Sequence, residues 1–253
     1  MSAPAATLPT SAPTSSVGPI ASTEFGAGLR RPLVDTAAIL ALNEQYRPLD
    51  FEARIRRLYA DFAPDKVLVT SSFAATSAYF LHIVATIRPQ QVVHFIDTGY
   101  HFAETLEYRQ YLIDRFGLTV ADVRAEDWQH QFTQEEKTWS KDPDFCCSVN
   151  KVEPLEQIKS QYQIWVSSLM RWQTEHRAEL DIFEVRRGII KFNPMIDVSQ
   201  AERDAYIREH DLPFHPLVAK GYSSIGCSHC TVPGDGRSGR WVGKPKTECG
   251  LHL

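Results

Sequence analysis

A short apolar segment that leads into a turn of small residues and then into a helix most constrains the fold of this chain. Residues 66–70 (KVLVT) are mostly apolar and β-branched, residues 71–77 (SSFAATS) are mostly small, and residues 78–87 have a helix-like apolar pattern. Strand, turn and helix in this order begin a βαβ unit. Ligands of such sheets bind beyond the carboxyl ends of the strands, so we expect the turn at 71–77 to border a binding site.

The same alternation continues along the chain. We expect further strands at residues 91–96, 118–123, 164–167, 182–186 and 189–193. We expect helices at residues 37–49, 51–62, 102–116, 152–160 and 199–210. Strands that alternate with helices of this length predict an α/β fold class with a doubly wound, mainly parallel sheet covered on both faces.

The two ends of the chain differ from this pattern. Residues 1–28 consist largely of Ala, Pro, Ser and Thr, which predicts a disordered tail in front of a single domain at residues 29–253. From residue 221 onward Gly, Pro, Lys and Arg dominate and almost no periodicity remains. We therefore expect residues 234–253 to form a flexible, mobile C-terminal segment.

Charge and hydropathy argue against several classes of protein. The chain has 27 Lys and Arg against 31 Asp and Glu, a net charge of -4, which gives nucleic acid or an anionic membrane little to bind. No apolar run approaches the roughly 18 to 20 residues of a membrane-spanning helix, and the first residues lack the apolar centre of a signal peptide. We expect a cytoplasmic protein with no nucleic-acid and no membrane partner, and a homo-oligomer is compatible with the sequence.

The five cysteines form two pairs and one single residue, all in the second half of the chain. Cys146 and Cys147 are adjacent, and Cys227 and Cys230 form a C-x2-C pair in a Gly-flanked turn. Four thiols in two close pairs predict a four-cysteine metal centre. An iron–sulfur cluster is slightly favoured over zinc because zinc sites rarely use a vicinal pair, while a redox pair or unrelated buried thiols are the alternatives.

Cys249 stands alone near the C-terminus, in a polar, Gly-containing segment where burial is hard to arrange. A partly exposed single thiol is a candidate nucleophile, with a reactivity that depends on its thiolate fraction. Lys244, Lys246 and His252 would favour the thiolate. Glu248 would oppose it, and an inert thiol is the alternative.

Seven motifs occur in a characteristic order. They are SSFAATS at 71–77, IDTGYHFAETLEY at 96–108, CCSVNKVEPL at 146–155, KFNPMID at 191–197, HPLVAKGYSSIGCSHC at 215–230, RSGRW at 237–241 and ECGLH at 248–252. With this set the chain resembles the assimilatory sulfonucleotide reductases, specifically the adenylyl-sulfate (APS) reductases. The resemblance extends from about residue 33 to the C-terminus, and it implies a fold of the adenine nucleotide alpha hydrolase-like (PP-loop) type.

The resemblance also implies a binding site for APS. The turn after the first strand would be a modified pyrophosphatase loop that holds the adenosine together with the Asp-Thr-Gly segment. The implied adenosine contacts are Ser71, Ser72, Phe73, Asp97, Thr98 and Gly99. The implied phosphosulfate contacts are Lys151, Arg237, Arg240 and His252, with Arg171 and Arg177 on a substrate loop.

The chemistry implied by the resemblance is a reduction in two steps, as part of assimilatory sulfate reduction and cysteine biosynthesis. The Cys249 thiolate would attack the sulfate sulfur of APS, release AMP and leave a cysteine S-sulfonate. A thiol of thioredoxin, or of glutaredoxin, would then release sulfite. The four paired cysteines would hold a 4Fe-4S cluster close to Lys151.

Two differences from the usual motifs of the family leave the identity of the substrate undecided. Asn150 stands where APS-specific members often carry Arg, and the segment LMRWQTEHR at 169–177 differs from the usual substrate loop. A phosphoadenylyl-sulfate (PAPS) reductase or a dual APS/PAPS reductase is therefore an alternative. A PP-loop tRNA-thiolating enzyme is more remote, because SSFAATS lacks the glycines and the Asp of an ATP-activating loop. A zinc-stabilised binding module would explain four cysteines but not ECGLH.

Overall fold

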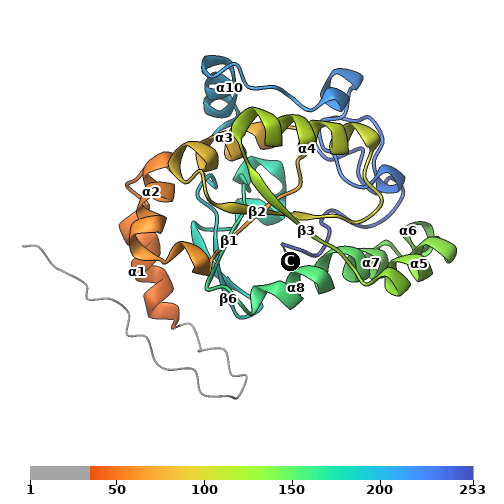
Figure 1. Cartoon of the computed structure of the whole chain (residues 1–253), viewed down its shortest axis with the longest axis horizontal. Coiled ribbons are helices and arrows are strands. Elements are labelled where there is room, and N and C mark those ends of the chain that lie inside the picture. The colour runs from red at the N-terminus through yellow and green to blue at the C-terminus, as the bar shows by residue number, and fades with distance from the viewer. Residues whose placement is uncertain (1–34, 253) are drawn as a thin grey trace, which may run out of the picture. The chain divides into compact units, whose positions relative to one another are not determined.

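The structure is a computed structural model that describes residues 35–252, so the predicted tail at residues 1–28 lies outside the described residues. Within the described part the strands form a six-stranded sheet in the order β3-β2-β1-β4-β6-β5 (Figure 1). The strands are β1 Val67–Ser71, β2 Val92–Ile96, β3 Thr119–Val123, β4 Ile164–Val166, β5 Phe183–Arg186 and β6 Ile189–Phe192. The predicted α/β class with a mainly parallel sheet is confirmed, since all neighbours except β5 and β6 are parallel.

The edge strand β5 runs antiparallel because of a two-residue turn. Arg187 and Gly188 connect β5 to β6, with φ of 48° and 77°. Two successive residues with positive φ form the type of turn that matches the twist of a hairpin. The sequence predicts both strands at the correct places, but this reversal is visible only in the structure.

Helices cover both faces of the sheet. They are α1 Thr36–Tyr46, α2 Phe51–Asp61, α3 Ser77–Ile87, α4 Ala103–Phe116, α5 Asp127–Glu135, α6 Thr138–Lys141, α7 Pro143–Cys147, α8 Glu153–Lys159, α9 Glu175–Ala178 and α10 Gln200–Glu209. Alternate residues of β1 enter different cores: Val67 and Val69 pack in the large one with α3 and α4, and Leu68 packs in a smaller one with Leu155 of α8. Figure 1 shows α3 and α4 on one side of the strands and α8 on the other, the doubly wound arrangement.

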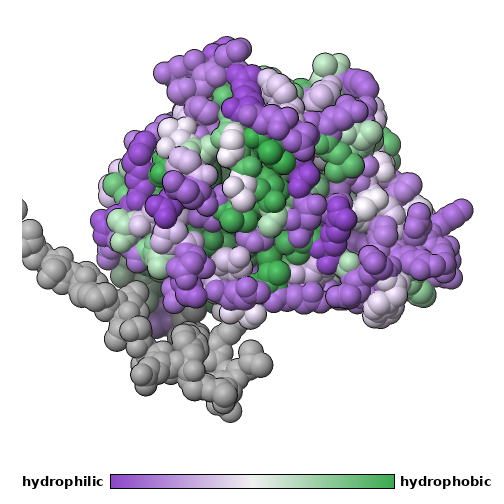
Figure 2. All heavy atoms as spheres, viewed as in Figure 1, coloured by the Kyte–Doolittle hydropathy of each residue, from purple (hydrophilic) through white to green (hydrophobic). Residues whose placement is uncertain are grey.

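The surface of the described part is mainly hydrophilic, as expected for a sheet that is covered by helices. Hydrophilic residues cover most of the face seen in Figure 2, and apolar residues gather toward its middle. Within residues 35–252 no helix has both the length and the apolar character needed to cross a membrane.

The chain beyond α10 has little regular structure. It contains two short 3-10 helices, Pro216–Lys220 and Ser228–Cys230, and then returns to the sheet. Near its end Leu251 packs against the core of β1, β4 and α8, and Figure 1 shows the C-terminus between the strands and α8. The mobility predicted for residues 234–253 stays a prediction, and the structure shows which contacts hold this segment.

Candidate active site

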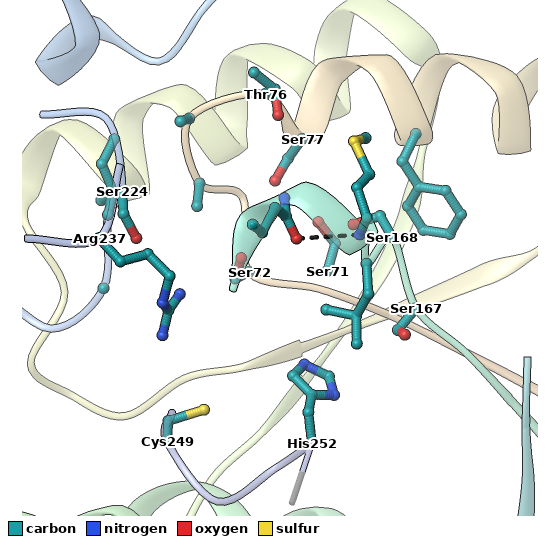
Figure 3. A pocket seen from close by; sticks show the side chains of 18 of the residues that line it. Ser71, Ser72, Thr76, Ser77, Ser167, Ser168, Ser224, Arg237, Cys249 and His252 are labelled. Atoms are coloured by element: carbon teal, nitrogen blue, oxygen red, sulfur yellow. Dashed lines mark hydrogen bonds between the residues drawn. The ribbon is translucent and has the colours of Figure 1, made fainter. Parts of the chain in front are cut away.

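A cavity of about 550 Å³ lies at the carboxyl edge of the sheet, where β1 and β4 end. Ser71 and Ser72 border it at the end of β1, and Ser167 and Ser168 border it after β4 (Figure 3). The order of strands reverses here, because β2 and β3 lie on one side of β1 while β4 and β6 lie on the other. A doubly wound sheet binds its ligands at such a switch point, so the cavity lies where the sequence predicts a binding site.

Phe73 supports the turn from beneath and does not line the cavity. Its φ is 48°, its side chain is fully buried, and its ring packs edge-on against Phe95 with centroids 5.5 Å apart. Its backbone N–H donates to Ser71 Oγ at 3.2 Å. The left-handed backbone turns the ring into the core, which differs from its expected contact with adenosine.

The Asp-Thr-Gly segment after β2 also lies outside the cavity lining. Asp97 accepts a hydrogen bond from the Gly99 backbone N–H at 3.0 Å and forms an ion pair of 2.5 Å with Arg124. The Thr98 hydroxyl lies 3.3 Å from Cys227 Sγ. The Thr98 contact ties the segment to the loop that carries Cys227. The side chains of residues 97–99 therefore do not line the cavity, although the resemblance implies that they contact adenosine.

Basic side chains and the single thiol meet in the cavity. Its lining includes Lys151, Arg177, Arg237, Arg240, Cys249 and His252. Figure 3 shows Cys249 and His252 across the cavity from Ser71 and Ser72, with Arg237 between Ser224 and Cys249. The fold therefore brings together residues that are far apart in the sequence and that match anionic phosphate and sulfate groups.

Arg171 is the exception among the predicted cationic residues, since it does not line the cavity. Its Nε donates to the Leu180 carbonyl oxygen at 3.2 Å, and its Nη2 lies 3.8 Å from an Asp181 carboxylate oxygen. The arginine thus faces the loop before β5. Its role as a substrate contact is not supported by this position.

Three residues that line the cavity carry a polar atom without a partner. Within residues 35–252, the Tyr79 hydroxyl, Arg240 Nε and His252 Nδ1 are buried and have no hydrogen-bond partner. Buried donors and acceptors are rarely left unpaired in a finished structure. Burial, with the positive charge of Lys191 and Arg177, holds the pKa of His252 well below its usual 6.5, so the imidazole is neutral near pH 7 and its ring stacks on Trp165.

Lys151 supplies positive charge between the two groups of thiols. It lines both the large cavity and a smaller one formed by the paired cysteines. Burial alone would lower the pKa of its ammonium group, but negative charge on the neighbouring thiols, Cys227 and Cys249 among them, raises the pKa above its usual value. Lys151 is therefore protonated and close to Cys249.

The two lysines near Cys249 in the sequence bind elsewhere. Lys244 donates to the Ser140 carbonyl oxygen at 2.9 Å, and Lys246 pairs with Asp144. Both contacts attach the tail to α6 and α7. The structure thus assigns these lysines to holding the tail, a role that sequence proximity to the thiol does not show.

The two cysteine pairs line one small cavity with aromatic walls. Cys146, Cys147, Cys227 and Cys230 are all free thiols and all border it. Trp139 and His229 stack at 4.2 Å in its wall, next to Tyr100. Within residues 35–252 no three His, Cys, Asp or Glu side chains are grouped closely enough to hold a single metal ion.

Asn150 belongs to the cysteine cavity and not to the lining of the large one. Its Nδ2 donates to Thr133 Oγ1 at 3.0 Å and to the Cys146 carbonyl oxygen at 3.1 Å, and its Oδ1 lies 3.0 Å from His130 Nδ1. The sequence singles out Asn150 for substrate choice. The structure places it where it supports the loop of Cys146, and no signal in the sequence points to His130 or Thr133.

Fold and site together define a class. A doubly wound sheet with a switch-point cavity that combines a serine-rich turn, several cations and a thiol is a nucleotide-binding α/β protein with an anion site beside a cysteine. The chain belongs to the phosphoadenosine phosphosulfate reductase family, since the model of the phosphoadenosine phosphosulfate reductase domain matches residues 66–233.

Curated relatives and a solved structure agree with this assignment. The chain is 39% identical over 231 residues to the adenosine 5'-phosphosulfate reductase of Chelativorans sp. (strain BNC1), a match that covers 88% of this chain and 94% of the relative. It is 36% identical over 230 residues to the phosphoadenosine 5'-phosphosulfate reductase of Gloeobacter violaceus, with 87% and 95% covered. The crystal structure of PAPS reductase from Candida auris shares the fold, with a TM-score of 0.67, 24% identity, and coverage of 79% of this chain and 98% of that one.

Proposed function

We propose that this protein is a sulfonucleotide reductase of sulfate assimilation and cysteine biosynthesis that converts APS to sulfite and AMP with thioredoxin as the reductant. The observation that carries the proposal is the position of Cys249 in the switch-point cavity, beside the cations Lys151 and Arg240. Membership of the reductase family supports the reaction class. The cytoplasm, where reduced thioredoxin is available, is the compartment that we propose.

In the first step the Cys249 thiolate attacks the sulfate sulfur of APS. A sulfur–sulfur bond forms, the bond from that sulfur to the bridging oxygen breaks, and AMP leaves with the electron pair. Lys151 and Arg240 bind the phosphosulfate oxygens and stabilise the negative charge that moves onto AMP. His252 is neutral and contributes hydrogen bonds rather than charge.

In the second step a thiolate of reduced thioredoxin attacks Cys249 Sγ. A mixed disulfide forms and sulfite leaves with the electron pair. The second thioredoxin thiol then displaces Cys249, so that thioredoxin is oxidised by two electrons and the enzyme thiol returns. Glutaredoxin could supply the same pair of thiols. The tail has to expose Cys249 between the steps, because the thiol that reacts with nucleotide must next meet a protein.

The paired cysteines fit a 4Fe-4S cluster by the chemistry of their donor set. A cluster of this type takes four cysteine thiolates, and Cys146, Cys147, Cys227 and Cys230 are four free thiols around one cavity. When bound, the cluster would supply a structural centre with an electric field beside Lys151. The Thr98 hydroxyl at 3.3 Å from Cys227 Sγ and the Asn150 amide near Cys146 would orient two of the ligand loops.

PAPS is the alternative substrate, and the PAPS reductase name of the Gloeobacter violaceus relative supports keeping it. The two substrates differ by one phosphate on the ribose. A comparison of kcat/KM for APS and PAPS on the iron-loaded protein separates them, and a strong preference for PAPS would overturn our choice of substrate.

The reaction itself is tested by its covalent intermediate. APS is added to the protein without reductant, and the peptide that contains Cys249 is examined by mass spectrometry. We expect one added SO₃ group on Cys249, which disappears as sulfite when reduced thioredoxin is added. Sulfite formation without any modification of Cys249 would contradict the mechanism, and absence of both would contradict the function.

A further inference from the structure

The residue before Cys249 is a buried acid bound by two arginines. The Glu248 side chain is 2% exposed, and its two carboxylate oxygens accept hydrogen bonds from Arg177 Nε and Nη2 at 2.8 and 2.9 Å. Arg237 Nη2 adds a bond of 3.2 Å, and the Thr174 hydroxyl adds one of 3.1 Å. Four hydrogen bonds therefore hold one carboxylate in the wall of the cavity.

The same two arginines form further hydrogen bonds with the tail and with the loop that carries Gln173. Arg177 Nη1 donates to the Gln173 side-chain oxygen. Arg237 donates from Nε and Nη2 to the Thr247 carbonyl oxygen at 3.2 and 2.6 Å. A guanidinium has five N–H donors in a fixed plane. The side-chain hydrogen bonds of Arg177 and Arg237 go to Thr247 and Glu248 of the tail and to Gln173 of the neighbouring loop.

The carboxylate and the guanidinium groups are ionised together. Burial alone would raise the pKa of Glu248, but the hydrogen bonds and charges of Arg177 and Arg237 outweigh it and hold the pKa below its usual 4.5. Burial lowers the pKa of Arg237 to about 10 against the attraction of Glu248, and the group still keeps its proton at pH 7. Removing one partner of such a group leaves a buried charge unpaired, which is strongly unfavourable.

Two other cations that line the cavity, Arg240 and Lys151, form no hydrogen bond with Glu248 among the described residues. Within residues 35–252 Arg240 Nε has no hydrogen-bond partner, and its Nη1 makes only long contacts of 3.3 and 3.5 Å to Ser224 Oγ and the Ile225 carbonyl oxygen. Lys151 lies between the thiols. Arg240 and Lys151 together can match the charge of a phosphosulfate group, whereas the single negative charge of Glu248 offsets only one of the two positive charges of Arg177 and Arg237.

We propose that Glu248 is a positioning residue for the reaction: its carboxylate clamps the C-terminal tail onto Arg177 and Arg237 and so holds Cys249 in the cavity. The inference builds on the proposed function and gives the two arginines a second role, since they hold the tail in addition to lining the cavity. The clamp acts together with the contacts of Lys244, Lys246 and Leu251 that also hold the tail. His176 Nε2 lies 2.9 Å from the His252 carbonyl oxygen and is a further attachment of the tail.

The clamp is tested without any nucleotide. Glu248→Gln removes the charge and keeps the size, and Arg177→Gln breaks the clamp from the other side. Glu52→Gln makes the same chemical change in an exposed pair with Arg56 on α2 and serves as the control. The measurements are the rate of Cys249 alkylation by iodoacetamide and the rate of tryptic cleavage after Lys246, each with a thermal melt to show that the variant is folded.

We expect Glu248→Gln and Arg177→Gln to raise both rates at least tenfold, and Glu52→Gln to leave them unchanged. Cleavage after Lys246 reports opening of the tail even if the loss of a neighbouring charge alters the thiol itself. A folded Glu248→Gln or Arg177→Gln protein whose tail stays protected would overturn the clamp. Because neither rate depends on APS, open tails in the two variants together with an original protein that makes no sulfite would contradict the proposed function and leave the clamp intact.

A second measurement tests whether Glu248 instead competes with the substrate for the two arginines. If Arg177 and Arg237 were substrate contacts masked by Glu248, removing the carboxylate would tighten APS binding. Equilibrium binding of APS is therefore compared between Cys249→Ser and the double variant Cys249→Ser/Glu248→Gln. The clamp predicts the same or a weaker affinity, and a tenfold or greater gain would overturn it.

Discussion

Arg177 Nε and Nη2 bind the two carboxylate oxygens of Glu248 at 2.8 and 2.9 Å, across 71 residues of sequence. Arg177 belongs to α9, in the loops that follow β4, and Glu248 belongs to the tail. The pair closes the cavity at the switch point of the sheet and places the neighbouring Cys249 in it. The reactive end of the site is thus formed only when the last residues of the chain fold back onto the sheet.

This ion pair predicts a pH dependence of stability. A carboxylate whose pKa is lower in the folded protein stabilises the fold above its unfolded value, here 4.5, and the contribution is lost as the pH falls through the folded pKa. We expect Glu248→Gln to lower the free energy of unfolding by about 3 kcal/mol at pH 7. Below pH 4.5 the difference from the original protein should shrink, by at most about 1.4 kcal/mol per pH unit. Urea unfolding at pH 7 and pH 3.5 measures both values, and a constant difference would contradict the assignment of charge.

The sheet could be predicted because its strands are short, mostly apolar runs, and all of them except β5 are followed by a helix. Residues 66–70 show this in sequence, and β1 occurs at Val67–Ser71. The direction of β5 could not be predicted, because it depends on the turn at Arg187 and Gly188. Arg-Gly is not among the dipeptides that mark hairpin turns, and positive φ at an arginine is set by the surrounding pairing.

The site could be predicted only in part, because sequence spacing does not determine where a side chain points. Motifs identify Lys151 and Cys249, and both line the cavity. They also suggest Phe73 and Arg171, but a left-handed backbone turns the first into the core and the Asp181 carboxylate attracts the second. The partner of Glu248 lies 71 residues away, so no local pattern could have revealed the clamp.

A buried arginine on α2 predicts a large loss of stability. Arg54 is 2% exposed and binds both carboxylate oxygens of Asp197, at 2.5 and 2.7 Å, and the Pro194 carbonyl oxygen at 2.9 Å. Arg54→Met would leave the Pro194 carbonyl oxygen without this donor, while the Asp197 side chain is 42% exposed and can be hydrated, so the variant should cost about 1.5–3 kcal/mol of unfolding free energy. Arg57→Met on the same helix removes an exposed pair with Asp61 and should cost less than about 1 kcal/mol. Equal losses in urea unfolding would show that burial of the pair does not decide the cost.

Two glycines with similar backbone angles make a matched test of crowding. Gly99 has φ of 70°, and a Cβ placed on it would lie 2.5 Å from His130 Cε1. Gly117 has φ of 63°, and a Cβ there would meet nothing within 4 Å. We expect Gly117→Ala to cost about 1–2 kcal/mol from backbone strain alone. Gly99→Ala should cost clearly more, because it also displaces the imidazole that contacts Asn150. Similar unfolding energies for the two variants would mean that His130 moves aside freely.

His215 predicts a loss of stability in mildly acidic solution. Its ring is buried, Nδ1 accepts from the Leu217 N–H at 3.1 Å, and burial lowers its pKa from 6.5 to about 4. The folded protein therefore holds the neutral form, so stability is complete above pH 6.5 and falls as the pH drops toward 4. The slope from this residue is at most about 1.4 kcal/mol per unit. His215→Asn keeps an acceptor at this helix start, and its unfolding energy should change less between pH 6.5 and 4. Parallel curves for the two proteins would exclude His215 as a source of the slope.

The division of the cysteines into four and one makes the sharpest prediction, because the same substitution should have opposite effects at two sites. Cys249 lines the large cavity with Lys151, whereas Cys227 is buried in the small cavity with the other paired thiols. Cys249→Ser should keep the iron content and the absorbance near roughly 400 nm that thiolate-bound iron–sulfur centres show. It should lower sulfite release by at least about a thousandfold, or roughly 4 kcal/mol in activation free energy, because serine cannot form the S-sulfonate.

Cys227→Ser should lose iron and colour, and its melting temperature should fall because a loop anchored through the cluster is released. Iron and sulfide analysis, absorbance and a sulfite assay on the two variants, purified without oxygen, provide the comparison. Loss of iron in Cys249→Ser would mean that the fifth cysteine belongs to the metal centre. A colourless original protein that contains zinc would contradict the cluster, while sulfite release from that protein would still support Cys249 as the nucleophile, since Cys249 lines the large cavity and not the small one.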